Sequence, residues 1–250
     1  MYTLIALHGN GGGGFRFSLA APHFPETVDF RAPTLPGFAN EPANPDLTSL
    51  KAYAQWLEEE VVQPAETPVV LLGHGIGGSV ALEYAQHYAD SICGLLLHAP
   101  VGADLEKRWF PRLMKLPGMR AFGKNLFSAQ LMRPVFRKLL FEQPPPRAFE
   151  QRFFREYRQC SVFGDFFDYI TAEWFNRLKP VELPALLVWG EKEKVLRVEQ
   201  AQKFQQLLPN ARIERIGGWD HFPMVDQPEH YARVIARLGQ EIISHAHAPH

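Results

Sequence analysis

The sequence has too few cysteines and too little net charge for several classes of protein. Cys93 and Cys160 are the only cysteines among 250 residues, and neither belongs to a Cys-x-x-Cys or Cys/His spacing. Two cysteines so placed indicate neither a disulfide framework nor a zinc site, and we expect both as small apolar core residues. The 26 basic and 27 acidic residues leave a net charge of −1. A protein that binds nucleic acid through many phosphates is normally far more basic, so nucleic acid is not the expected partner.

Long apolar runs and a basic leader are also lacking. No stretch reaches the roughly 18 apolar residues of a membrane span, and residues 1–9 do not resemble a signal peptide. We therefore expect a cytoplasmic protein without a membrane span. Hydrophobic residues make up 46% and charged residues 21% of the chain, the balance of an ordinary globular protein. A chain of this length favours one domain, with or without an insertion.

Short apolar runs alternate with helical patterns along much of the chain. Helices are expected over residues 47–62 and 77–88, and strands over 3–7, 27–31, 68–72, 92–98, 185–189 and 211–216. The run 68–72 is apolar throughout, as in a strand buried on both faces. This alternation predicts an α/β fold with a mostly parallel central sheet and helices on both faces.

Residues 101–180 break the alternation. They carry 15 basic and 8 acidic residues, against 11 and 19 in the rest of the chain, and 12 of the 19 phenylalanines. We expect them to form an inserted helical cap over a core made of residues 1–100 and 181–244. The positive charge is either a solvated face or an attractor for an anionic or amphiphilic ligand. Residues 245–250 contain three histidines, and we expect a flexible surface tail rather than a metal site.

The most informative stretch is Gly73-His74-Gly75-Ile76-Gly77, between a predicted buried strand and a predicted helix. Gly73 and Gly77 fit a turn at which strand and helix approach too closely for a Cβ. The start of the helix directs backbone N–H groups toward the turn. The segment resembles the G-x-S-x-G nucleophile elbow of the α/β-hydrolase family, and the resemblance extends over nearly the whole chain.

Other segments resemble the family in the same chain order. His8-Gly9 is similar to the His-Gly segment whose following loop supplies one N–H of the oxyanion hole, and residues 33–38 resemble the family's Asp-x-Pro-Gly-x-Gly stretch. The resemblance implies Asn10 or Gly11 as one oxyanion donor and Ile76 as the other. We expect His8 and His74 to line the substrate site. Gly11 to Gly14 lack the Lys-Ser/Thr ending of a nucleotide-phosphate loop.

The family's acid and base have counterparts near the end of the chain. Residues 186–193 resemble the strand and turn that present the acid, and residues 218–224 resemble the turn that holds the histidine. The resemblance implies Glu193 and His221 in these roles. Asp104 is the alternative acid, because some members place it after the preceding strand.

Position 75 departs from the family, because glycine stands where the nucleophile belongs. Glycine has no side chain to attack a carbonyl, so the covalent route is closed at this position. Ser79 lies one helical turn further on, and we expect it to be packed rather than reactive. Glycine does relieve the backbone strain of an elbow, about 1–3 kcal/mol for other residues.

Three functions are compatible with this departure. The first is a hydrolase or lyase in which His221, oriented by Glu193, activates water or takes a proton from a small ester-like substrate, without cofactor or metal. The aromatic and basic cap suggests an apolar substrate that carries an anionic group. The second is a non-catalytic ligand-binding protein. The third is a serine esterase whose nucleophile was changed to glycine by engineering. We favour the first, because a purely binding pocket has no need of an oriented base.

Overall fold

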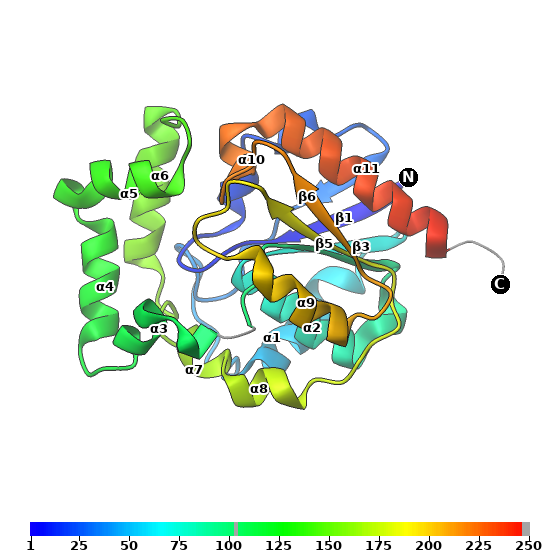
Figure 1. The fold of residues 1–250 in the computed structure, drawn as a ribbon, viewed down its shortest axis with the longest axis horizontal. Coiled ribbons are helices and arrows are strands. Elements are labelled where there is room, and N and C mark those ends of the chain that lie inside the picture. The colour runs from blue at the N-terminus through cyan, green and yellow to red at the C-terminus, as the bar shows by residue number, and fades with distance from the viewer. Residues whose placement is uncertain (103–104, 247–250) are drawn as a thin grey trace.

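The chain folds around a six-stranded sheet in which all neighbouring strands are parallel. The computed structural model describes residues 1–102 and 105–246. The strand order is β2-β1-β3-β4-β5-β6 (Figure 1). The strands are β1 (Tyr2–Leu7), β2 (Val28–Arg31), β3 (Val69–His74), β4 (Gly94–His98), β5 (Ala185–Gly190) and β6 (Arg212–Ile216). Each strand that was expected from the sequence is present, with ends that differ by one or two residues.

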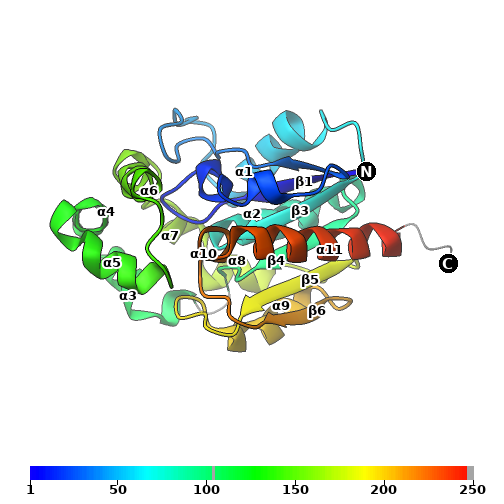
Figure 2. The ribbon, with the colours of Figure 1, turned by 90° about the horizontal axis from the view of Figure 1, so that it is seen from above.

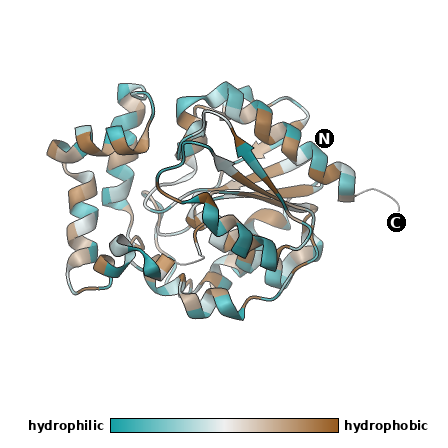
Figure 3. Cartoon of the chain, in the orientation of Figure 1, coloured by the Kyte–Doolittle hydropathy of each residue, from teal (hydrophilic) through white to brown (hydrophobic). Residues whose placement is uncertain are grey.

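Helices cover both faces of this sheet. On one face lies α11 (Pro228–Ala246), and on the other lie α1 (Leu50–Leu57), α2 (Ile76–Tyr88) and α9 (Ala201–Leu207), as Figures 1 and 2 show. The strands β1, β3, β4 and β5 are buried along their whole length, which explains their continuous apolar sequence. Figure 3 shows polar residues on the edge strand β6, in which every position is half-buried or exposed. The fold is the α/β-hydrolase fold.

The helix expected over residues 47–62 begins three residues later, at Leu50, and changes from an α-helix to a π-helix near its end. The Ser49 side chain accepts a hydrogen bond from the Ala52 N–H at 3.2 Å and caps α1, which therefore starts at Leu50. A π-helical turn, Glu58–Val62, continues it. There the buried Glu58 carboxylate accepts hydrogen bonds from Tyr84 and Ser91.

The segment between β4 and β5 contains helices and, in its described part, no strand. These helices are α3 (Trp109–Met114), α4 (Met119–Ser128), α5 (Arg133–Leu140), α6 (Arg147–Gln159), α7 (Phe166–Tyr169) and α8 (Ala172–Arg177). Figure 1 shows α3 to α6 beyond one end of the sheet. A Cβ built on Gly11, in the loop after β1, would lie 2.2 Å from the Tyr157 ring of α6. The segment therefore packs on the carboxyl ends of the strands, where ligand sites of open α/β sheets lie.

The C-terminal helix extends further than the sequence indicated. His245 and Ala246, which we placed in a flexible tail, form the last turn of α11, and the His245 ring contacts the Glu241 carbonyl at 2.7 Å. The rest of that tail, residues 247–250, lies outside the described residues. Within the described residues, no helix combines the length and apolarity needed to cross a bilayer.

Candidate active site

The turn from β3 into α2 is tightly packed against neighbouring backbone. A Cβ on Gly73 would lie 2.6 Å from the Gly77 carbonyl oxygen, and one on Gly77 would lie 2.5 Å from the Leu7 carbonyl oxygen. Neither contact leaves room for a side chain, so the expected need for glycine at both positions is confirmed. The Gly77 N–H also donates to the His8 carbonyl at 3.1 Å, which ties the turn to the end of β1.

Gly75 is different, because it has space around it but a backbone conformation that would be strained for any other residue. Its φ of 57° and ψ of −119° lie in a region that other residues rarely adopt. A Cβ at this position would meet only the Gly9 Cα within 4 Å, at 3.4 Å. Position 75 can therefore hold a small side chain at the cost of backbone strain.

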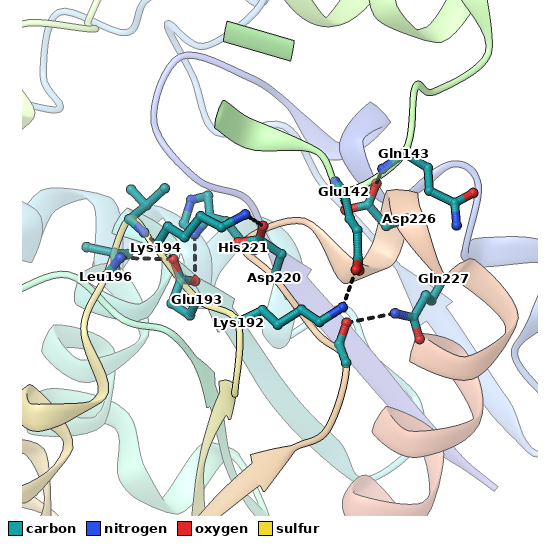
Figure 4. A network of polar contacts seen from close by, with 12 residues as sticks. Glu142, Gln143, Lys192, Glu193, Lys194, Leu196, Asp220, His221, Asp226 and Gln227 are labelled. Atoms are coloured by element: carbon teal, nitrogen blue, oxygen red, sulfur yellow. Dashed lines mark hydrogen bonds and ion pairs between the residues drawn. The ribbon is translucent and has the colours of Figure 1, made fainter. Parts of the chain in front are cut away.

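His221 and Glu193 form a close pair near this turn (Figure 4). The His221 Nδ1 lies 2.8 Å from Glu193 Oε2, and the Glu193 side chain is 1% exposed. The other carboxylate oxygen of Glu193 accepts hydrogen bonds from the amides of Val195 and Leu196, at 2.6 and 2.9 Å. With Nδ1–H donating to the carboxylate, a neutral His221 ring keeps Nε2 as a proton acceptor. The sequence-based expectation that these two residues meet agrees with this geometry.

The environment of Glu193 keeps it ionised. Burial alone raises the pKa of a carboxyl group, but the charge and hydrogen bond of His221 and the two amides outweigh burial and lower the pKa of Glu193 to about 2. Glu193 is therefore a fixed negative charge beside the imidazole over the whole neutral range. Such a charge selects the ring tautomer and stabilises an imidazolium.

This pair predicts a specific loss of stability in acid. The pKa of Glu193 lies below its ordinary value of 4.5, so the ionised carboxylate stabilises the fold above about pH 4.5. That contribution is lost as the pH falls through about 2. We expect the unfolding free energy of the parent, relative to Glu193→Gln, to decrease by about 2 kcal/mol between pH 5 and pH 2.5. Urea unfolding at both pH values measures this, and a difference that does not change with pH would contradict it.

A second carboxylate fixes the backbone of the histidine. Asp220 is buried, accepts a hydrogen bond from the His221 N–H at 2.8 Å, and contacts Lys194 Nζ at 2.7 Å. Its contact is with the main chain of His221, so Glu193 is the acid that reaches the ring. In Figure 4, Lys192 also pairs with Glu142, which links the loop after β5 to the chain between α5 and α6.

Three further histidines are buried around the turn. His74 lies 4.9 Å from the His221 ring, centroid to centroid, and its Nε2 contacts the His221 carbonyl at 3.1 Å. Burial lowers the pKa of His74 well below its usual value, and burial lowers that of His98 to about 3. His74 therefore stays neutral and holds the His221 segment against residue 75. No motif of the sequence indicates His98, whose ring centroid lies 4.8 Å from that of His74 and 5.7 Å from that of Trp219.

His8 contacts backbone groups through both of its ring nitrogens. It is fully buried, its Nε2 accepts a hydrogen bond from the Leu35 N–H at 3.0 Å, and its Nδ1 lies 3.0 Å from the Gly9 carbonyl. Burial lowers its pKa to about 3. Both ring nitrogens already have backbone partners, so His8 supports the loop after β1 and offers no free ring nitrogen to a substrate.

The loop after β1 faces α6 rather than open solvent. The Asn10 side chain donates to the Phe163 carbonyl at 3.3 Å, whereas its buried Oδ1 has no partner in the part of the chain that the structure describes. The Gly13 N–H donates to Glu156 of α6 at 3.1 Å. Across from this loop, Ile76 opens α2, so its N–H is one of the first-turn amides that have no acceptor within the helix.

Two hollows of the surface lie away from this turn. One of about 330 Å³ is lined by residues that include Glu58 and Cys93, and one of about 450 Å³ by residues that include Tyr2 and Arg233. Neither contains Gly75 or His221. Within residues 1–102 and 105–246, no three His, Cys, Asp or Glu side chains are grouped closely enough to hold a metal ion.

The sequence also led to expectations for Ser79, for the two cysteines and for Asp104. Ser79 is buried and its hydroxyl donates to the Val101 carbonyl at 2.7 Å, so it is packed as expected. Cys160 is buried and Cys93 is half-buried, and both are free thiols. Asp104, the alternative acid, lies outside the described residues.

Comparison with known proteins agrees with this fold. YugF, an uncharacterised hydrolase of Bacillus subtilis, is 24% identical over 94% of this chain and 88% of its own length. The monoacylglycerol lipase ABHD6 of Rattus norvegicus is 22% identical over 76% of this chain and 59% of its own length. A putative lipase from Acinetobacter baumannii has a similar structure, with a TM-score of 0.76, 22% identity, and coverage of 98% of this chain and 85% of that one. The family model described as the alpha/beta hydrolase family matches residues 4–234, and the chain therefore belongs to this family.

Proposed function

We propose that this protein is a hydrolase or lyase that acts on a small ester-like substrate without a covalent nucleophile. The observation that carries the proposal is the 2.8 Å contact between His221 and the buried, ionised Glu193, beside the β3–α2 turn. An imidazole oriented in this way is a general base, and it needs a proton donor within reach. Lipases and a hydrolase among the relatives support the same class of reaction.

In this proposal Gly75 is the vacant nucleophile position of the elbow. The positive φ and the close approach of β3 and α2 are the geometry that presents a nucleophile in the family's motif. The space next to Gly75 then takes a water molecule or a group of the substrate. The N–H of Ile76, at the positive end of the α2 dipole, and that of Asn10 or Gly11 are the proposed oxyanion donors.

Hydrolysis then proceeds by a single displacement with water. His221 Nε2 accepts a proton from water, and the hydroxide adds to the carbonyl carbon while the oxyanion donors hold the developing charge. The tetrahedral species collapses, the bond to the alcohol oxygen breaks, and the imidazolium returns its proton to that oxygen. Water and ester give acid and alcohol. Related sites that lack a member of the triad keep about 10³–10⁴-fold catalysis over water.

The proposed cap, residues 101–180, selects the substrate. Its α6 rings pack on the loop that follows β1, and Phe153 lies 5.3 Å from Phe222 next to His221. Aromatic walls favour an apolar substrate, and the basic balance of the segment favours one with an anionic group. Residues 1–100 and 181–244 form the core beneath it.

Hydrolysis of short and medium-chain p-nitrophenyl esters by the parent and by His221→Ala tests the proposal. We expect slow turnover by the parent that decreases at least tenfold in the variant, because only the histidine removes the proton. Ser79→Ala, in a packed serine of α2, is the matched control and keeps the parent's rate. Turnover that survives in His221→Ala would overturn the proposed base. No turnover in either protein would favour a ligand-binding protein, a reading supported by the aromatic rings that close over the loop.

A further inference from the structure

Arg16 is a buried cation without an acidic partner. It follows the glycine loop after β1, in the short 3-10 turn Gly14–Phe17, and is 2% exposed. Among the ion pairs of the described residues, none includes Arg16. Its Nε and Nη2 are buried and have no hydrogen-bond partner among residues 1–102 and 105–246. Buried arginines are normally paired, since removing a cation from water costs several kcal/mol.

Aromatic rings are what surrounds this guanidinium. Its Cζ lies 4.6 Å from the centroid of Phe153, 4.8 Å from that of Tyr157 and 5.5 Å from that of Phe222. A cation over an aromatic face gains about 0.5–2 kcal/mol, less than the cost of burying it. The buried carboxylate of Glu156, which lies on α6 with Phe153 and Tyr157, already accepts hydrogen bonds from the Gly13 N–H and from Arg152. The positive charge of Arg16 is therefore compensated only in part.

The two unpartnered nitrogens share one edge of the guanidinium. Nε–H and Nη2–H point in nearly the same direction, and this edge is the one that binds a carboxylate through two parallel hydrogen bonds. Gly12 packs against this edge, and any side chain at position 12 would block it, because a Cβ there would lie 1.9 Å from Nε and 2.5 Å from Nη2. A carboxylate is the planar anion that fits this edge.

Arg16 also lies beside the proposed reaction centre. A Cβ built on Gly9 would lie 3.4 Å from Arg16 Nη1 and 3.3 Å from His74 Nδ1, and the Gly9 Cα is the atom nearest to a Cβ at position 75. Gly9 thus separates the guanidinium from the elbow by the width of one residue. A ligand held by Arg16 would extend along the loop toward Gly75.

We propose that Arg16 binds a carboxylate of the substrate and thereby places an ester-like carbonyl of the same molecule at Gly75. The substrate class is an apolar, preferably aromatic, ester or thioester with a free carboxylate. Phe153 and Tyr157 move aside when it enters, and their faces pack against its apolar part. The inference depends on the proposed function only for the position of the carbonyl, since the anion site itself requires no reaction.

Calorimetric titration with phenylacetate and with its neutral isostere phenylacetamide tests the site without any turnover. We expect the parent to bind phenylacetate at least tenfold more tightly than phenylacetamide. Methionine is apolar and of similar length to arginine. In Arg16→Met the Kd for phenylacetate should therefore rise at least tenfold, whereas the Kd for phenylacetamide should stay the same. The matched control is Arg133→Met, because the Arg133 guanidinium also lies near a ring, 5.8 Å from the centroid of Phe154, with a buried unpartnered Nε. It should bind both probes as the parent does.

The thermal stability of the same variants separates a binding role from a structural one. A cation retained for binding is a cost to the fold, so Arg16→Met should keep or raise the Tm of the parent. Equal affinity of the parent for the two probes, no binding of phenylacetate at millimolar concentration, or unchanged binding by Arg16→Met would each overturn the carboxylate site. If the parent binds phenylacetate as expected but hydrolyses no p-nitrophenyl ester, only the proposed function is overturned.

Discussion

Replacing Gly75 with serine is expected to create or strongly raise esterase activity. The hydroxyl would stand at the elbow, where the oriented His221 can accept its proton, so water no longer has to be the attacking group. Complete triads accelerate hydrolysis by up to about 10⁶-fold over sites that lack them. We expect kcat for a p-nitrophenyl ester to rise by about 10²–10⁴-fold, together with covalent labelling by a fluorophosphonate.

Gly75→Ala is the matched control for this gain of function. Both variants add a Cβ at a φ of 57°, so both carry the same strain, about 1–3 kcal/mol, and both should lower the Tm. Only serine adds the hydroxyl. A serine variant that folds but neither turns over faster nor labels better than the alanine variant would contradict the elbow assignment or the position of His221. In Gly75→Ser, adding His221→Ala should remove the labelling.

The fold could be predicted from the sequence because its signals are local. The run before Gly73 is apolar at successive positions, which only a strand buried on both faces requires, and the glycines of the β3–α2 turn report a close approach of backbone. The pairing of Glu193 with His221 was predictable only through the family's motif order. Their contact joins residues 28 positions apart, and no periodicity of the chain specifies it.

The missed residues are those whose role depends on tertiary packing. Arg16 looks like an ordinary surface arginine in sequence, and nothing in its neighbours indicates that rings of α6 and the ring of Phe222, just before α10 (Pro223–Asp226), enclose it. The hydrogen bonds of His8 could not be predicted for the same reason, because one of its two backbone partners is Leu35, which is distant in the chain. A buried charge and a doubly bonded imidazole become visible only when their surroundings are known.

The glycine at the proposed elbow and the pair Glu193–His221 have opposite effects on the stability of the fold. Glycine at position 75 removes backbone strain and so stabilises the protein, whereas a buried carboxylate beside a histidine is stable only while both are paired. The Glu193 side chain is only 1% exposed, and its carboxylate is paired with the His221 ring and with the amides of Val195 and Leu196. A protein that needed only the shape of this site could replace Glu193 and His221 with apolar residues. The presence of the pair therefore supports a chemical role for these two residues.

Replacing Glu193 with glutamine in the Gly75→Ser background is expected to lower kcat by about 10³–10⁴-fold. The amide keeps the shape of the side chain but removes the charge that stabilises the imidazolium, and its NH₂ group can face Nδ1 and impose the wrong tautomer. Steady-state kinetics on a p-nitrophenyl ester measures the effect. The loss should appear in kcat more than in KM, because the interaction strengthens as His221 takes the proton.

Asp220→Asn is the control that assigns this effect to one carboxylate. Asp220 is as buried as Glu193 and lies next to His221 in the chain, but it bonds the His221 N–H and Lys194 rather than the ring. Its replacement should lower the Tm and change kcat by less than about tenfold. If Asp220→Asn lost as much activity as Glu193→Gln, the ring would owe its orientation to the whole turn. If Glu193→Gln lost little, another acid would have to orient the ring, and the pair on which the proposed mechanism depends would have no chemical role.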